Sequence, residues 1–109
     1  MEEYSNIVIF VTVVNKEEAA KIAGVLLTQK KVACVNIIPS INSMYWWRGQ
    51  IETTQESMLL IKTKASQLQV IIDEVKGLHS YAVPEIIALP IIGGSSDYLN
   101  WIDNEVGKN

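Results

Sequence analysis

The sequence predicts an α+β fold of a single domain. Two stretches with helical spacing of apolar residues alternate with stretches of β-branched residues. The chain has 109 residues, which is enough for one hydrophobic core. Apolar residues make up 49% of the chain and charged residues 19%, a balance too apolar for an intrinsically disordered protein. No linker, low-complexity segment or internal repeat divides the chain, so residues 1–109 are expected to form one domain.

The first strand and the first helix follow each other directly. Ile7–Val14 is β-branched almost throughout and reads as a strand covered on both faces. Asn15 suits the N-cap of a helix, and Glu18, three residues later, would complete a capping box. Lys30 and Lys31 fall in the expected last turn, where positive charge suits the helix dipole. The apolar stripe of this helix consists of Ala19, Ile22, Ala23, Leu26 and Leu27.

The middle of the chain predicts a hairpin with long arms. A strand is expected over Val32–Ile38, and Pro39 should end it. An extended pattern resumes over Ile41–Trp47. Arg48-Gly49-Gln50 is a turn signal, after which Ile51–Lys64 can return as a long strand.

The last third of the chain predicts a helix, a strand and a short final helix. The spacing of apolar residues favours a helix that ends near Leu78. Glu85–Ile92 reads as the last strand, and residues 93–96 as a loop. Asp97 then precedes a short C-terminal helix. The second helix carries Leu68, Ile71, Ile72, Val75 and Leu78, and the final helix carries Leu99, Trp101, Ile102 and Val106.

The order of elements is strand, helix, strand, strand, helix, strand. Two right-handed crossovers of this kind give a ferredoxin-like βαββαβ sandwich, with both helices on one face of a four-stranded antiparallel sheet. The other face should then alternate with polar residues, yet Ile7–Val14, Met58–Ile61 and Ile86–Leu89 are apolar at both parities. An apolar face of this size needs cover. We therefore predict an obligate homo-oligomer; the alternative is cover by the C-terminal helix of the same chain.

Charge and cysteine content exclude several classes of partner. The formal net charge is −3 and Arg48 is the only arginine, which argues against nucleic-acid binding. A single cysteine, Cys34, excludes an intrachain disulfide and a thiolate-cluster zinc site, and its apolar neighbours predict a buried thiol. The first residues do not resemble a signal peptide, and Ile7–Val14 is too short to span a membrane. We expect a cytoplasmic protein without a membrane partner.

Five blocks of the sequence carry a resemblance to a known family. They are Ala33–Pro39, Ser43–Gly49, Leu60–Lys64, Leu78–Pro90 and Asp97–Ile102. In order and spacing they resemble the CutA family of divalent-cation tolerance proteins over about residues 7–102. The resemblance implies a ferredoxin-like fold similar to the PII signalling proteins. It also implies a tight homotrimer, in which long hairpins and sheet edges of neighbouring subunits pair, and a role in tolerance to copper and other divalent cations.

The resemblance also suggests metal ligands, of which this chain keeps few. Proposed ligands in bacterial relatives are a cysteine near the end of the first strand and two neighbouring histidines. The cysteine position falls here at Val11 or Thr12, and of the two histidines only His79 is present. A tight Cu(II) or zinc site needs three or four N, O or S ligands. The resemblance therefore implies at most weak binding of Cu(II) or another divalent cation, shared among copies of His79 or with Glu85 or Asp103. The alternative is a histidine at a helix C-terminus, favoured by the dipole.

A pocket between subunits is the second candidate site. Clefts between subunits bind ligands in PII-like trimers, and the alternative is a polar network that fixes the register of the trimer. Adjacent Trp46 and Trp47 must point to opposite sheet faces, one to the core and the other to an interface. Ser80 replaces the family's usual proline and Ala82 its usual acidic residue, which leaves the loop less rigid and would weaken a site that needs that carboxylate. By analogy, the candidate pocket residues are Tyr45, Trp47, Lys62, Tyr81 and Glu85.

The residues do not form a recognisable catalytic set. His79 is the only histidine, so a Ser-His-Asp triad with a second histidine is absent, and Gly93-Gly94 lacks the GK[ST] context of a phosphate loop. RNA-binding domains of this topology need aromatic residues on the central strands, where only Phe10 is present. We expect a non-enzyme: a CutA-type homotrimer associated with divalent-cation tolerance. The alternative is a PII-like regulatory or scaffolding trimer that binds a small anion or another protein.

Overall fold

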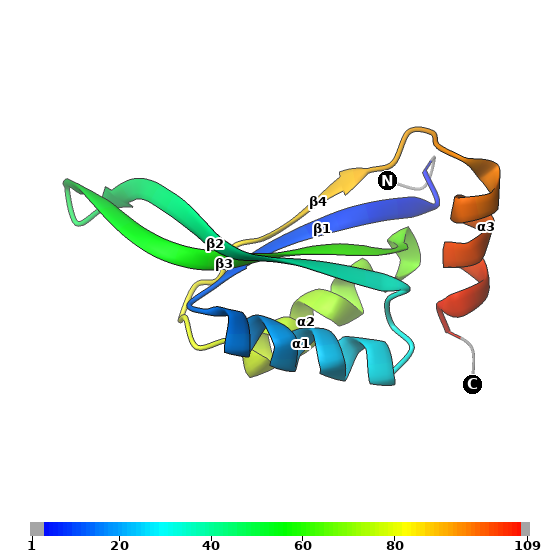
Figure 1. Cartoon of the computed structure of the whole chain (residues 1–109), viewed down its shortest axis with the longest axis horizontal. Helices are drawn as coiled ribbons and strands as arrows, with labels where there is room; N and C mark the ends of the chain where they lie inside the picture. Colours follow the sequence, from blue (N-terminus) through cyan, green and yellow to red (C-terminus); the bar gives the residue numbers. More distant parts are fainter. Residues whose placement is uncertain (1–3, 108–109) are drawn as a thin grey trace.

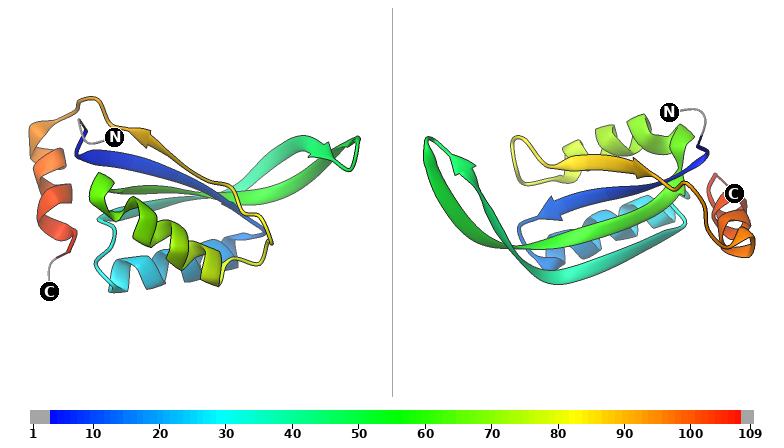
Figure 2. Two further views of the ribbon diagram at one scale, coloured as in Figure 1. Left: turned by 180° about the vertical axis from the view of Figure 1, so that it is seen from behind. Right: turned by 90° about the horizontal axis from the view of Figure 1, so that it is seen from above.

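The computed structural model describes residues 4–107 and confirms the α+β class. Its sheet has four antiparallel strands in the order β2-β3-β1-β4. Helices α1 and α2 cover one face of this sheet, and α3 lies at one end of it (Figures 1 and 2). The elements are β1 (Asn6–Val13), α1 (Lys16–Thr28), β2 (Cys34–Trp47), β3 (Gln50–Lys64), a 3-10 turn (Ala65–Gln67), α2 (Leu68–Leu78), β4 (Ile86–Pro90) and α3 (Ser96–Glu105).

The core lies between the sheet and the two helices. Alternate residues of β1 and β3 face the helices, because successive side chains of a strand point to opposite faces. Burying each such aliphatic side chain stabilises the fold by about 1.5–3 kcal/mol. The predicted helical stripes meet this face. The fully buried residues include Ile7, Ile9, Val11, Leu59 and Ile61 from the strands and Ile22, Leu26, Ile71 and Val75 from the helices.

The N-terminus of α1 is capped as predicted, but only half of the capping box forms. Asn15 Oδ1 accepts a hydrogen bond from the Glu18 backbone N–H at 2.9 Å. The Glu18 carboxylate turns away from Asn15 and instead accepts from the backbone N–H of Ser80 at 3.3 Å. The residue expected to close the cap therefore links α1 to the loop after α2.

The prediction that Lys30 and Lys31 lie in the last turn of α1 is wrong. The helix ends at Thr28, and Lys30 has a positive φ of 61°. The N–H of Lys30 bonds to the carbonyl of Leu27, and that of Lys31 to the carbonyl of Leu26, which is the Schellman pattern of helix ends. A lysine holds the left-handed position that glycine usually takes, which hid this helix end from the sequence pattern.

Pro39 does not end β2, contrary to the prediction. The strand continues to Trp47 because the register shifts between Ile38 and Ile41, which places the proline in a bulge. At that position no backbone N–H is needed for pairing with β3, so proline is tolerated. The Ser57 hydroxyl donates to the Pro39 carbonyl at 2.7 Å and holds the bulge to β3. The hairpin then projects beyond the helices, so the molecule measures 44 × 26 × 22 Å (Figure 1).

The tip of the hairpin exposes aromatic residues on both faces. Arg48 and Gly49, with φ of 51° and 80°, form the turn, and left-handed residues at both positions match the strand twist. Trp46 is 73% exposed and Trp47 is 53% exposed. The prediction that one of these two tryptophans lies in the core is therefore wrong for a single subunit, because the hairpin extends past every helix.

The sheet face opposite α1 and α2, here called the helix-free face, carries mainly apolar residues. Helix α3 packs only at the end of the sheet, where Ile102 and Val106 are buried and Asn6 Nδ2 donates to Asp103 Oδ1 at 2.9 Å. Ile87 remains 52% exposed and Leu89 50% exposed. The C-terminal helix therefore does not cover this face. The apolar residues of the helix-free face are Val8, Phe10, Ile38, Met58, Leu60, Ile87 and Leu89.

Two smaller differences concern the ends of the sheet. The last strand covers only Ile86–Pro90, shorter than the predicted Glu85–Ile92, because only residues 86–90 pair with β1. The prediction that Cys34 is buried is wrong: it is partly exposed at the start of β2. Its side chain points to the helix-free face, opposite Lys62, and not into the core.

Candidate functional site

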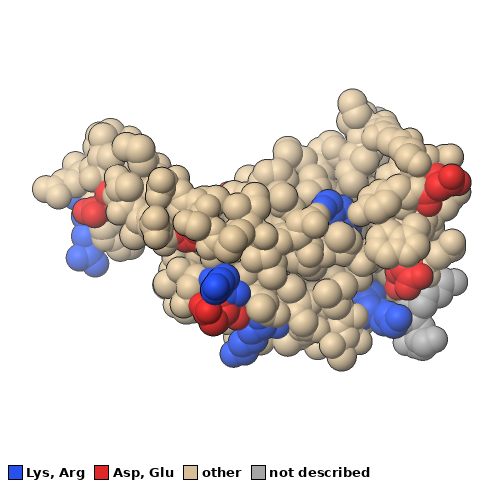
Figure 3. Space-filling model, in the orientation of Figure 1, with Lys and Arg blue, Asp and Glu red and all other residues tan. Residues whose placement is uncertain are grey.

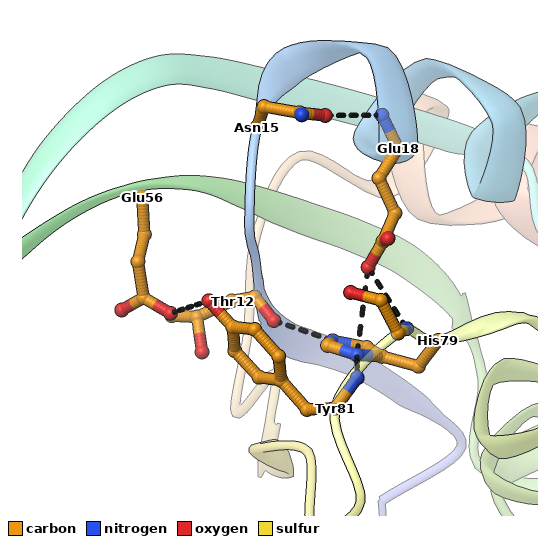
Figure 4. A network of polar contacts seen from close by, with 7 residues as sticks. Thr12, Asn15, Glu18, Glu56, His79 and Tyr81 are labelled. Carbon is orange, nitrogen blue, oxygen red and sulfur yellow. Dashed lines mark hydrogen bonds and ion pairs between the residues drawn. The ribbon is translucent and has the colours of Figure 1, made fainter.

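His79 lies at the centre of a polar network under the base of the hairpin (Figure 4). It is the C-cap of α2, where its own N–H bonds to the carbonyl of Val75 at 2.9 Å. Its side chain is fully buried. Nε2 lies 2.7 Å from the carbonyl oxygen of Thr12 in β1, and Nδ1 accepts from the Tyr81 N–H at 3.0 Å. The histidine therefore ties the loop after α2 to the central strand of the sheet.

These partners define the protonation of the ring. A carbonyl oxygen only accepts, so Nε2 carries the proton, and a backbone N–H only donates, so Nδ1 is unprotonated. The ring is thus the neutral Nε2–H tautomer, with both nitrogens engaged by the backbone. In this arrangement His79 has no free lone pair for a metal ion. Metal ligation by His79 stays a prediction, and it requires the loop to release Nδ1.

Glu18 supports the same loop from α1. Its carboxylate oxygen lies 3.5 Å from His79 Nδ1 and accepts from the Ser80 N–H. Ser80 thus supplies a backbone donor that a proline at this position would lack. The sequence signalled Glu18 only as half of a capping box, and nothing in its spacing placed it beside His79.

Tyr81 extends the network to the hairpin. Its hydroxyl donates to the Glu56 carboxylate at 2.8 Å, and its ring lies 4.8 Å from the His79 ring, measured between centroids. Burial first, and then the hydrogen bond to Glu56, raise the pKa of the Tyr81 phenol well above its usual range. Further along the hairpin, the Thr54 hydroxyl donates to the Tyr45 hydroxyl at 2.8 Å. Glu56 had no distinctive sequence signal, since its partner lies 25 residues away.

The raised pKa of Tyr81 predicts alkaline sensitivity. In the unfolded chain a tyrosine loses its proton near pH ~10, whereas folded Tyr81 keeps it to higher pH. Above pH ~10 the unfolded state therefore binds fewer protons than the folded state, and the free energy of unfolding should fall as pH rises. Urea unfolding of wild type and Tyr81→Phe between about pH 9 and pH 11 measures this. We expect a shallower decline in the variant; equal slopes would contradict this role for Tyr81.

The structure brings together only some of the predicted pocket residues within one subunit. Tyr81 bonds to Glu56 at the base of the hairpin, and the phenol of Tyr45, which pairs with Glu52 nearer the tip, contributes to the pKa shift of Tyr81. Trp47 lies at the tip, stacked under Arg48 at 5.4 Å. Glu85 is exposed just before β4. Lys62 is on β3 six residues beyond Glu56, about 20 Å away at 3.3 Å per residue. A pocket holding all five would need residues from more than one subunit.

Among residues 4–107, no three His, Cys, Asp or Glu side chains gather closely enough to hold a metal ion. Within the same range, no helix has the length and apolar character to cross a membrane.

Comparison with known proteins gives the family. The family described as CutA1 divalent ion tolerance protein matches residues 7–105. This chain belongs to that family. The family description names tolerance of divalent ions and no catalysed reaction.

Among CutA relatives, "Protein CutA 1, chloroplastic" of Oryza sativa subsp. japonica is 50% identical over 104 residues. That match covers 95% of this chain and 59% of the relative, so the chain spans about three fifths of the plant protein's length. The crystal structure of CutA1 from Oryza sativa superposes with a TM-score of 0.92 at 46% identity, and covers 97% of each chain.

A CutA structure from Archaeoglobus fulgidus, described as a periplasmic divalent cation tolerance protein, gives a TM-score of 0.89 at 42% identity and covers 92% of this chain and 97% of its own. These likenesses confirm the ferredoxin-like fold. The compartment differs among these relatives, since one is chloroplastic and another periplasmic.

Proposed function

We propose that this chain forms a CutA-type homotrimer that acts in tolerance to divalent cations, copper among them. The observation that carries the proposal is the helix-free face. Ile87 and Leu89 are about half exposed there, and Tyr45, Trp46 and Trp47 of the hairpin are exposed as well. Figure 3 shows that uncharged side chains make up most of the molecule's upper surface. At roughly 25 cal/mol per Å², burial of such a surface supplies a large driving force for association.

The same proposal assigns a structural part to the His79 network. His79, Glu18 and Tyr81 fix the loop that leads into β4, and Tyr81 in turn anchors Glu56 at the base of the hairpin. Both the hairpin and β4 are edge elements of the sheet. We propose that this network sets the register in which copies of the chain pair. The protein then acts by binding and assembly and not by catalysis, and we place it in the cytoplasm.

A cell-based assay tests the proposed role. Cells that lack their own CutA protein should grow at higher copper concentrations when they carry the wild-type chain. Cells carrying an assembly-deficient form, Ile87→Asp with Leu89→Lys, should lose that advantage at equal protein levels. Equal growth of both strains in copper would contradict a tolerance role that depends on the trimer.

Metal contact through His79 is a separate part of the proposal. Because both ring nitrogens are engaged by the backbone, we expect Cu(II) to bind only weakly, at a site shared between copies. Calorimetric titration should show a heat that falls in His79→Ala. Cys34→Ser serves as the matched control for thiol ligation. Identical heats for wild type and His79→Ala would remove His79 as a ligand.

A PII-like regulatory trimer remains the second candidate. The observation that favours it is a set of polar groups along the hairpin: Tyr81 bonds to Glu56 at its base, and Thr54 bonds to the Tyr45 hydroxyl further along. In that reading the pocket residues bind a small ligand between subunits, and Lys62 and Glu85 come from neighbouring copies.

A further inference from the structure

The charges on the helix-free face are separated along β3. Side chains alternate along a strand, so Glu52 and Glu56 lie on the same face as Lys62 and Lys64. The two glutamates lie on the hairpin side and the two lysines lie toward α3 (Figure 1). Among residues 4–107, the residues of β1, β2 and β4 that pair on this face carry no charge. The face therefore has an acidic end and a basic end.

Within one subunit Glu52 and Lys62 are too far apart to meet. They are ten residues apart on one strand, which is about 33 Å at 3.3 Å per residue. Neither forms an ion pair with another residue of 4–107. Lys62 Nζ donates to the Asn36 side-chain oxygen, and Glu56 accepts from the Tyr81 phenol. Within the described chain, Glu52 is thus the glutamate of this face whose carboxylate still lacks a partner.

Both charges lie among apolar residues that need cover. In the strand register Glu52 is opposite Tyr45, which is 41% exposed. Lys62 pairs with Val8, whose neighbour on the other side is the half-exposed Leu89 of β4. When other copies cover these apolar residues, water also leaves the two charges. A buried charge without a partner is costly, so both charges then need a counter-charge.

The direction in which copies pack decides whether the charges are paired. If equal ends of the face meet, Lys62 lies near Lys62 and Glu52 near Glu52, and like charges repel strongly where water is excluded. If the hairpin of one copy lies over the sheet of the next, Glu52 meets Lys62. The hairpin projects beyond the helices of its own subunit and can reach a neighbour in this way (Figure 1). Repeated around a three-fold axis, this head-to-tail contact pairs every Glu52 with one Lys62.

We propose that Glu52 on the hairpin of one copy forms an ion pair with Lys62 of the next copy, and that this pair fixes the head-to-tail direction of assembly. The inference rests on the proposed homotrimer and names the contact that orients its subunits. Lys62 Nζ has two N–H donors beyond the one that it gives to Asn36, so it can bind a carboxylate and keep that bond. The apolar residues around both groups exclude water and strengthen their attraction.

Reversal of the two charges tests the pair. Glu52→Lys and Lys62→Glu each place like charges in the seam, so each should speed subunit exchange between differently tagged trimers by about tenfold or more. A chain that carries both substitutions has opposite charges again and should exchange within about threefold of wild type. Because the two groups cannot meet within one chain, such a rescue reports a contact between copies.

Two exposed positions on the helices provide matched controls. Asp73→Lys on α2 changes the net charge as much as Glu52→Lys does, and Lys21→Glu on α1 changes it as much as Lys62→Glu does. Helices α1 and α2 lie on the opposite side of the sheet from the helix-free face (Figure 2). Both control variants should therefore exchange subunits like wild type.

The outcomes separate this inference from the proposed function. A wild-type chain that is monomeric by mass fails the trimer proposal itself. If wild type is a trimer but the two single effects simply multiply in the double variant, the Glu52–Lys62 pair alone is overturned. Single variants that exchange like wild type overturn it as well. If a reversal variant does not fold, Glu52→Gln and Lys62→Gln take its place; the pair then predicts that the double variant exchanges no faster than either single variant, and multiplied effects overturn it.

Discussion

Replacing Ile87 with aspartate and Leu89 with lysine should convert the trimer into monomers. Both side chains lie on the helix-free face and are already half exposed in one subunit. The substitutions should therefore cost the isolated subunit little folding stability. In the trimer each substitution removes roughly 1.5–3 kcal/mol of free energy gained by burying the apolar side chain, and the new charge must also be desolvated. We expect the association constant to fall by at least about a thousandfold, which corresponds to about 4 kcal/mol. Size-exclusion chromatography with light scattering measures the change.

A matched control keeps this result specific. Val70 is 45% exposed on α2, on the opposite side of the molecule from the helix-free face. Val70→Asp therefore adds a charge at a similarly exposed apolar position without touching the proposed seam. We expect it to stay trimeric. A double variant that remains trimeric would show that the helix-free face is not the interface.

Replacing His79 with alanine should destabilise the subunit strongly. The substitution leaves the Thr12 carbonyl and the Tyr81 N–H without their partner and opens a cavity where a fully buried ring stood. Each buried polar group left unpaired costs about 1–3 kcal/mol, so for the two groups we expect a total loss of about 2–6 kcal/mol. Urea unfolding gives the free energy, and hydrogen exchange at the loop of residues 79–84 should rise.

Thr12→Val is the control for His79. It removes the Thr12 hydroxyl but keeps the backbone carbonyl that accepts from the ring. We expect a loss of less than about 1 kcal/mol, because the deleted hydroxyl has no part in the network. If His79→Ala unfolds at the same urea concentration as wild type, the histidine does not hold the loop.

The sequence predicted the elements whose signals are local. The β-branched run of β1, the apolar stripes of α1 and α2 and the Asn15 cap all lie in short windows and agree with the structure. Two boundaries differed because an unusual residue took a special position. Lys30 holds a left-handed helix end normally given to glycine, and Pro39 is tolerated in mid-strand because it lies in a bulge.

The candidate site was harder to predict because its contacts join distant parts of the chain. His79 meets Thr12 across 67 residues and Ser80 meets Glu18 across 62, and no spacing rule links such pairs. Lys62 and Tyr81 were grouped by analogy with trimer clefts, yet in one subunit Lys62 joins Asn36 and Cys34 instead. The two-sided apolar strands did predict the uncovered face that the structure shows.

The mass of the wild-type protein in solution tests the central claim most directly. The claim is that the helix-free face and the hairpin require other copies of the chain to cover them. Light scattering or sedimentation at micromolar concentration should give three times the 12.2 kDa of one chain, with no detectable monomer. A stable, soluble species of one chain mass at that concentration would contradict the account.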